Sequence, residues 1–222
     1  MSLLLNIETA TKNCSVSLAK DGITILTKEI SEEGYSHAER LHVFIEEILN
    51  ETQTSFQDLK AVAVSKGPGS YTGLRIGVSA AKGICYGLTI PLISVDTLQV
   101  LARQVKIEEG IIIPMLDARR MEVYSAVFDK NFTKIMDVQA EVLTAESYAE
   151  IEESTYFIGD CQEKCKTVLT KPNFHFVSNI IFPSANEMSA LSYQKFVNQE
   201  FEDVAYFEPF YLKDFMITKK KI

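Results

Sequence analysis

The sequence predicts an α/β protein with two lobes, because one order of elements (three strands, a helix, a strand and a helix) occurs twice in its 222 residues. Asp21-Gly22 separates the second and third strands, where a type I′ turn needs residues that accept positive φ. Asp129-Lys130-Asn131 occupies the equivalent place in the second half. The length suits one large domain or two small ones. We therefore expect a first lobe over residues 1–102 and a smaller second lobe over 103–222, and we leave open that the last helix packs back on the first lobe.

The first half contains five strand-like runs and three helix-like runs. Ser36 and Glu39 form a capping box that begins the first helix, and Asp96 or Thr97 caps the third. An apolar stripe at helical spacing follows the capping box; it consists of Leu41, Phe44, Ile45, Ile48 and Leu49. The expected strands are 3–7, 14–20, 23–30, 61–65 and 91–95, and the expected helices are 36–50, 71–88 and the run after 96.

The second half begins in the same way, with three strands. A short helix is expected after Thr144 and another from Asp160. The expected strands are 111–116, 122–128, 133–142, 155–158 and a run near 175–177, and the last helix covers 185–199. This order of elements resembles the duplicated ribonuclease H-like architecture of the actin, sugar-kinase and Hsp70 superfamily.

Acidic residues outnumber basic ones by 30 to 22, which gives a net charge of −8. A protein that grips nucleic acid alone usually carries a basic surplus, because contacts to phosphates supply most of the affinity. The basic cluster at 219–221 is short, so we expect something else to hold any nucleic acid. No apolar run approaches the roughly 20 residues of a membrane span, and the N-terminus lacks the pattern of a signal peptide. We expect a soluble, cytoplasmic protein with no membrane partner.

Neither the cysteines nor the histidines favour a metal site. These residues are Cys14, Cys85, Cys161, Cys165, His37, His42 and His175. Cys161 and Cys165 lie four apart, a spacing that common zinc and redox sites do not use. His37 and His42 lie five apart, so on a helix they point about 140° apart. We expect reduced structural cysteines and surface histidines.

Two segments have features of a phosphate-binding turn. The turn after the first strand carries the hydroxyls of Thr9 and Thr11, but its acid is Glu8 and it contains no glycine. The loop before the second helix contains Gly67 and Gly69, yet it fits neither the Rossmann nor the P-loop spacing. Free N–H groups at a helix start can bind an anion. Thr9, Thr11, Gly67 and Gly69 are therefore candidates for residual phosphate binding, with sharp turns as the structural alternative.

The helix over 71–88 has an unusual distribution of small residues. Its polar stripe consists of Arg75, Ser79, Lys82 and Tyr86, and a flat face beside it consists of Gly73, Gly77, Ala80 and Gly87. An interior glycine costs about 1 kcal/mol relative to alanine, so Gly77 and Gly83 indicate close approach of a neighbour. We expect that neighbour to be another molecule, and Gly77→Leu to disrupt the interface while the lone protein stays folded. The expected interface residues are Leu41, Ile45, Gly73, Leu74, Gly77, Val78, Ala80 and Ala81.

Several motifs together resemble one family. They are Ile7-Glu8-Thr9-Ala10-Thr11, the segment 66–77, Asp117-Ala118-Arg119 followed by Glu122-Val123-Tyr124, and Glu208-Pro209-Phe210-Tyr211-Leu212. In these motifs the chain resembles the TsaB family, also called YeaZ. The resemblance covers essentially the whole chain, and the 66–77 segment is its most specific part.

The resemblance implies a non-catalytic partner of TsaD in bacterial synthesis of N6-threonylcarbamoyladenosine, a tRNA modification beside the anticodon. TsaD transfers threonylcarbamoyl to the tRNA adenosine, and the small ATPase TsaE joins the complex. The resemblance also implies that the metal-binding histidines of TsaD fall here on Thr97 and Leu101, which cannot replace imidazole. No catalytic residue, metal or cofactor is expected, and tRNA is expected to contact the chain only through the complex.

The resemblance also bears on assembly and on alternative functions. Without TsaD, the same helices are expected to pair two copies of the chain, because an apolar face is costly to leave in water. The main alternative is an ATP-dependent small-molecule transferase or kinase of the same superfamily, and a third interpretation is a metalloprotease. The transferase or kinase needs a phosphate-binding turn, and the metalloprotease needs metal ligands.

Overall fold

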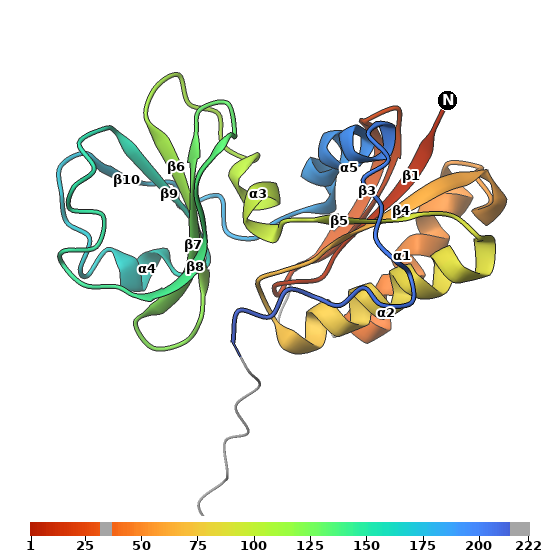
Figure 1. The fold of residues 1–222 in the computed structure, drawn as a ribbon, viewed down its shortest axis with the longest axis horizontal. Helices are drawn as coiled ribbons and strands as arrows, with labels where there is room; N and C mark the ends of the chain where they lie inside the picture. Colours follow the sequence, from red (N-terminus) through yellow and green to blue (C-terminus); the bar gives the residue numbers. More distant parts are fainter. Residues whose placement is uncertain (32–36, 214–222) are drawn as a thin grey trace, which may run out of the picture.

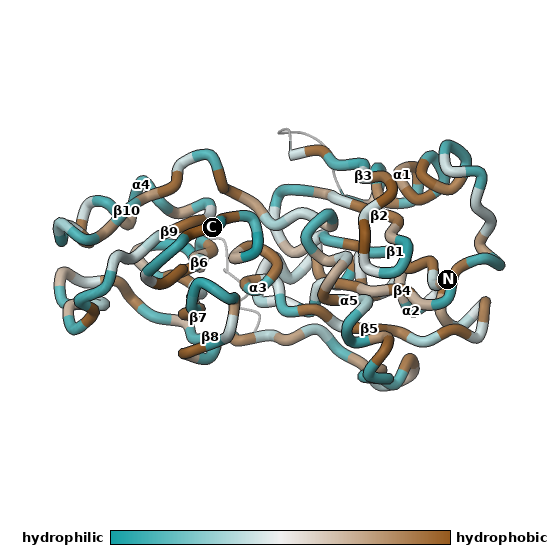
Figure 2. Tube along the Cα trace, turned by 90° about the horizontal axis from the view of Figure 1, so that it is seen from above, coloured by the Kyte–Doolittle hydropathy of each residue, from teal (hydrophilic) through white to brown (hydrophobic). Residues whose placement is uncertain are grey.

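The computed structural model describes residues 1–31 and 37–213, which form two lobes side by side with one helix between them (Figure 1; Figure 2). The first half contains β1 (Leu3–Glu8), β2 (Cys14–Lys20), β3 (Ile23–Ile30), α1 (His37–Glu51), η1 (Phe56–Asp58), β4 (Leu59–Ser65), α2 (Tyr71–Leu88), β5 (Leu92–Val95) and α3 (Thr97–Ala102). The second half contains β6 (Ile111–Asp117), β7 (Glu122–Asp129), β8 (Lys134–Val142), β9 (Thr155–Gly159), α4 (Gln162–Cys165), β10 (Phe174–Phe176), η2 (Ala185–Glu187) and α5 (Met188–Val197).

The first sheet has the strand order β3-β2-β1-β4-β5. The pairs among β1, β2 and β3 are antiparallel, whereas β4 pairs in parallel with both β1 and β5. Helices α1 and α2 cover one face of this sheet, and α5 covers the other. Because successive strand residues point to opposite faces, Leu5 and Ile7 of β1 pack with α1 and α2, while Leu4 packs with Met188 and Leu191 of α5.

The second sheet has the order β10-β9-β6-β7-β8. Leu98 and Leu101 of α3 pack on one face, against Ile112 and Phe128 among others. Cys161 and Cys165, together with the segment after β8, cover the opposite face. Helix α3 therefore belongs to the core of the second lobe, although it follows the last strand of the first.

The sequence predicted most of these elements, and the bounds of β2, β3 and α2 agree with the prediction. The helix predicted after Thr144 is wrong, because hydroxyl-stabilised turns replace it. The Thr144 N–H bonds to Ser147 Oγ at 3.1 Å, and Tyr148 adopts a positive φ of 58°, which an α-helix does not allow. The predicted last helix starts as the short helix η2 and ends at Val197. The capping residue Ser36 lies outside the described residues.

A C-terminal strap, residues 200–213, runs back from α5 across the first lobe (blue in Figure 1). The Glu202 N–H donates to Leu92 O at 2.9 Å, and the Phe210 N–H donates to Lys66 O at 2.7 Å. Lys82 Nζ donates to both Ala205 O and Phe207 O, each at 3.0 Å. Lys82 belongs to the predicted polar stripe of α2, and its ammonium group ties the strap to this helix.

Helix α2 packs closely on the turn between β1 and β2. Thr9 Oγ1 donates a hydrogen bond to Gly73 O at 2.8 Å. A Cβ atom on Gly73 would lie 2.1 Å from Thr9 O, and one on Gly77 would lie 2.2 Å from Thr9 Oγ1. The neighbour that these two glycines accommodate is thus the chain's own turn. The expectation that Gly73 and Gly77 form an exposed flat face is wrong. Glycines inside a helix also occur where another part of the same molecule approaches the helix closely.

The turn itself is closed by a buried carboxyl group. Glu8 Oε1 accepts the Ala10 N–H at 2.6 Å and the hydroxyl of Ser65 at 3.0 Å, while Oε2 has no hydrogen-bond partner within the described residues. Burial without a countercharge raises the pKa of Glu8 from 4.5 to about 7, against the smaller lowering effect of its hydrogen bonds. The Ser70 N–H, donating to Ala10 O at 2.6 Å, joins this turn to the start of α2.

Alanine substitutions at two glycines of α2 should change the stability of the protein in opposite directions. Gly77→Ala should lower the free energy of unfolding by about 1–3 kcal/mol, because its methyl group meets Thr9 and forces the helix outward. Gly83→Ala should raise that free energy by up to about 1 kcal/mol, because nothing lies within 4 Å of its Cβ and alanine favours a helix. Urea unfolding of both variants measures the difference. Equal effects would contradict the placement of α2.

Glu8→Gln tests the buried carboxyl group. The folded-state pKa lies above the unfolded one, so the native protein binds more protons and its stability falls as pH rises from about 4.5 to 7. At pH 8 the ionisation of buried Glu8 lowers the free energy of unfolding by about 3 kcal/mol. Glutamine keeps the Oε1 acceptor and carries no charge. The stability of Glu8→Gln relative to wild type should therefore grow between pH 5 and pH 8, as measured by urea unfolding. A relative stability that does not change with pH would show that Glu8 is not buried as a neutral acid.

Candidate partner-binding groove

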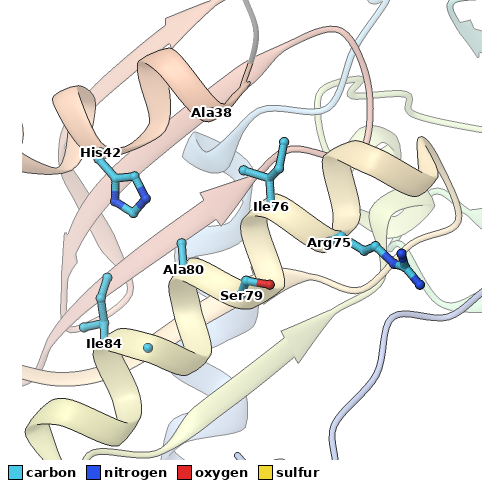
Figure 3. Close-up of a pocket in the computed structure, with 8 residues that line it drawn as sticks. Ala38, His42, Arg75, Ile76, Ser79, Ala80 and Ile84 are labelled. Carbon is cyan, nitrogen blue, oxygen red and sulfur yellow. The ribbon is translucent and has the colours of Figure 1, made fainter.

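A shallow groove runs between α1 and α2 on the outer side of the first lobe (Figure 3). It encloses about 560 Å³. Its lining residues are Ala38, His42, Arg75, Ile76, Ser79, Ala80, Gly83 and Ile84. In Figure 3, Ile76, Ala80 and Ile84 line the side of α2 that faces α1, whereas the Arg75 side chain points away from His42. The groove is mostly apolar and has small residues along its floor.

The sequence of each helix decides which residues line this groove. The apolar stripe of α1 is buried against the sheet. The buried face of α2 consists of Gly73, Leu74, Gly77, Val78, Ala81 and Cys85. Residues between these positions are left on the outside, and in α2 they include Ser79, Ala80 and Gly83. Because these side chains are small, another helix can approach α2 closely along this line.

Of the eight residues predicted for the interface, Ala80 alone lines the groove. The other seven are buried in the first lobe: Leu41, Ile45, Gly73, Leu74, Gly77, Val78 and Ala81. The prediction was wrong for these side chains because an apolar helical stripe first faces the chain's own sheet. Nothing lies within 4 Å of the place where a Cβ atom would stand on Gly83 or Gly87. The sequence indicates a close neighbour at Gly83 and places Gly87 on the flat face, but neither glycine is among the eight predicted interface residues.

The polar groups of the groove do not form a catalytic arrangement. No hydrogen bond joins His42 to Ser79 among the contacts of the described chain, and no carboxylate lines the groove. The Arg75 guanidinium lies 4.1 Å from the centre of the Tyr71 ring, which supports it by a cation–π contact. Nearby, His37 Nε2 lies 2.8 Å from Thr11 O, and burial lowers the pKa of this histidine. The groove is suited to packing against helices.

The four candidate phosphate-binding residues come together in the structure, where they contact other parts of the fold. Thr9 Oγ1 is buried and bonded to Gly73 O. Thr11 Oγ1 accepts the Asn13 N–H at 3.3 Å. A Cβ on Gly69 would lie 2.3 Å from Ala10 O, and one on Gly67 would lie 2.7 Å from Phe210 O. The structure therefore favours the alternative of sharp turns that pack on one another.

The two positions compared with metal ligands are also part of the fold. Thr97 Oγ1 accepts the Gly67 N–H at 3.1 Å, and Leu101 is fully buried in the core of the second lobe. Across residues 1–31 and 37–213, no group of three or more histidine, cysteine, aspartate or glutamate side chains is placed to hold a metal ion. In the same part of the chain, no helix is both long and apolar enough to cross a membrane.

Comparisons with known proteins identify the family. The family model described as tRNA N6-adenosine threonylcarbamoyltransferase, TsaD, matches residues 30–218. The tRNA threonylcarbamoyladenosine biosynthesis protein TsaB of Escherichia coli is 28% identical, over 98% of this chain and 97% of its own length. TsaB of Bacillus subtilis is 35% identical over 56% of this chain and 54% of its own.

A solved structure of YeaZ from Pseudomonas aeruginosa has the same fold. It superposes with a TM-score of 0.81 at 24% identity, covering 96% of this chain and 100% of that one. The order of strands and helices and the match over nearly the full length agree with the resemblance found in the sequence. The chain belongs to the tRNA N6-adenosine threonylcarbamoyltransferase family, and within it to the TsaB (YeaZ) proteins.

Proposed function

We propose that this chain is a non-catalytic, cytoplasmic subunit of the bacterial machinery that makes N6-threonylcarbamoyladenosine in tRNA. In this role it binds TsaD through the groove between α1 and α2 and supports TsaD in the transfer of threonylcarbamoyl. The ATPase TsaE joins the two in a larger complex. The observation that carries the proposal is the apolar, small-residue groove, which lacks catalytic groups, in a chain that is similar to TsaB over its whole length.

A division of labour between the lobes follows from this proposal. The lobe built on the first sheet carries both groove helices and acts as the partner-binding lobe. The chain then forms the second lobe and returns to supply α5 to the first sheet. Leu101 cannot bind a metal, and Thr97 already accepts a backbone hydrogen bond, which supports a non-catalytic role. An ATP-dependent transferase receives no comparable support, because the hydroxyls of Thr9 and Thr11 hold the fold.

The first test places a bulky charge in the groove. Gly83→Arg should weaken binding to TsaD at least tenfold, about 1.4 kcal/mol, because its side chain occupies the space that a partner helix needs. The fold should stay intact, since nothing lies within 4 Å of a Cβ at this position. Titration calorimetry measures the affinity, with circular dichroism to check the fold.

A matched control separates shape from charge. Gln57→Arg adds the same charge at an exposed position of η1, outside the groove, and should leave the affinity for TsaD unchanged. Equal affinities of Gly83→Arg and wild type for TsaD would show that the groove is not the binding site. A loss of affinity in both variants would assign the effect to charge.

The groove should also pair two copies of the chain when TsaD is absent. A two-fold dimer places the same surface on both subunits, and the apolar groove would be covered in each. Light scattering at tens of micromolar should give about 50 kDa, twice the chain mass of 24.9 kDa. Gly83→Arg should reduce this towards the monomer mass, and TsaD should dissolve the wild-type dimer. A dimer that tolerates Gly83→Arg would contradict pairing through the groove.

A further inference from the structure

We infer that three arginines at the junction of the lobes contact the phosphate backbone of the tRNA while the complex holds it. These junction arginines are Arg75 in α2 and Arg119 and Arg120 in the turn between β6 and β7. The inference rests on the proposed function, because TsaD and TsaE bring the RNA to this face. The inference gives a binding role to the turn between β6 and β7, which does not line the groove.

The first observation is the backbone of the β6–β7 turn. Arg119 and Arg120 are consecutive and both adopt positive φ, 71° and 53°. Residues with a Cβ are disfavoured there, whereas glycine or asparagine adopts this region readily. Both arginines are exposed, so packing does not require their side chains. The fold would be served better by other residues, which indicates that the arginines serve another purpose.

The second observation is that these two guanidinium groups are not neutralised. In the described part of the chain, neither of them forms an ion pair, although the protein carries a net charge of −8. The acids beside them are already engaged. Asp117 pairs with Lys164, and Glu122 pairs with Lys213. The turn therefore presents two unpaired positive charges on a rigid support, since Lys164 Nζ also holds Arg120 O at 2.9 Å.

The third observation connects this turn with the groove. Arg75, which lines the groove, stacks on Tyr71, and the Tyr71 ring lies 4.7 Å from that of Tyr211 in the strap. Two residues further on, Lys213 pairs with Glu122 at the start of β7. Figure 1 shows the strap running along α2 towards the second lobe. The strap thus contacts both regions, because Tyr211 lies against the ring that supports Arg75 and Lys213 pairs with Glu122, two residues after Arg120.

Guanidinium groups bind phosphate oxygens with two parallel hydrogen bonds. Separate guanidinium groups along a line suit the repeated phosphates of a nucleic acid backbone. They read no base sequence. Three such contacts cannot hold RNA to an acidic protein at physiological salt, so the isolated chain should not bind tRNA measurably. In the complex, the same contacts add to those that TsaD makes.

The test uses the assembled complex of this chain with TsaD and TsaE, and tRNA as the probe. The double variant Arg119→Asn, Arg120→Asn removes both charges and keeps residues that accept positive φ. Filter binding between 50 and 200 mM salt should show at least a threefold loss of tRNA affinity. The slope of log affinity against log salt should become shallower by about 1.4 to 1.8, as expected for two lost phosphate contacts. The melting temperature should not fall.

Lys60→Gln with Lys106→Gln removes two exposed charges elsewhere and should leave the salt slope unchanged. An unchanged affinity and slope in the arginine variant would overturn the inference while the proposed function stands. If the arginine variant no longer bound TsaD or TsaE, the inference would be overturned, because the arginines would then contact an acidic surface of a partner protein and not the tRNA. Failure of the wild-type chain to join TsaD would overturn the proposed function, and this inference with it.

Discussion

The contact between α2 and the turn after β1 determines how the first lobe presents its surface. Thr9 bonds to Gly73 O, and Gly77 leaves room for the same threonine side chain. These contacts fix both the height of α2 above the sheet and its rotation about its own axis. The rotation decides that Ala80 and Gly83 face outward beside α1 and that Val78 and Ala81 face inward. The groove is thus a consequence of a small buried hydrogen-bonded contact on the opposite side of the helix.

Local patterns in the sequence were sufficient to predict most of the strands and helices and the two-lobed fold. Turn signals such as Asp21-Gly22 and the apolar spacing of α1 depend on neighbouring residues only, and the structure confirms them. The helix after Thr144 failed because its turns depend on side-chain hydroxyls and on the positive φ of Tyr148. Neither is visible as a period in the sequence.

The candidate site was harder to predict, for a physical reason. A glycine in a helix indicates that something approaches closely, but not whether the approach comes from within the molecule or from a partner. Gly77 faces Thr9 and Gly83 faces open space, although the two lie in the same helix. Likewise, the sequence placed Lys82 in a polar stripe of α2 but could not show what its ammonium group binds, because the strap comes from the far end of the chain.

The position of α5 has a consequence for the way the protein is made. Met188 and Leu191 cover a face of the first sheet whose strands, β1 to β5, are all complete by Val95. At bacterial rates of synthesis, the ribosome needs roughly 5 to 20 seconds to translate the intervening second lobe. During that interval Leu4, Ala61 and Ile93 lack the cover of Met188 and Leu191. The nascent chain therefore exposes an apolar sheet face that general chaperones can bind, and the first lobe is completed only after the second has left the ribosome.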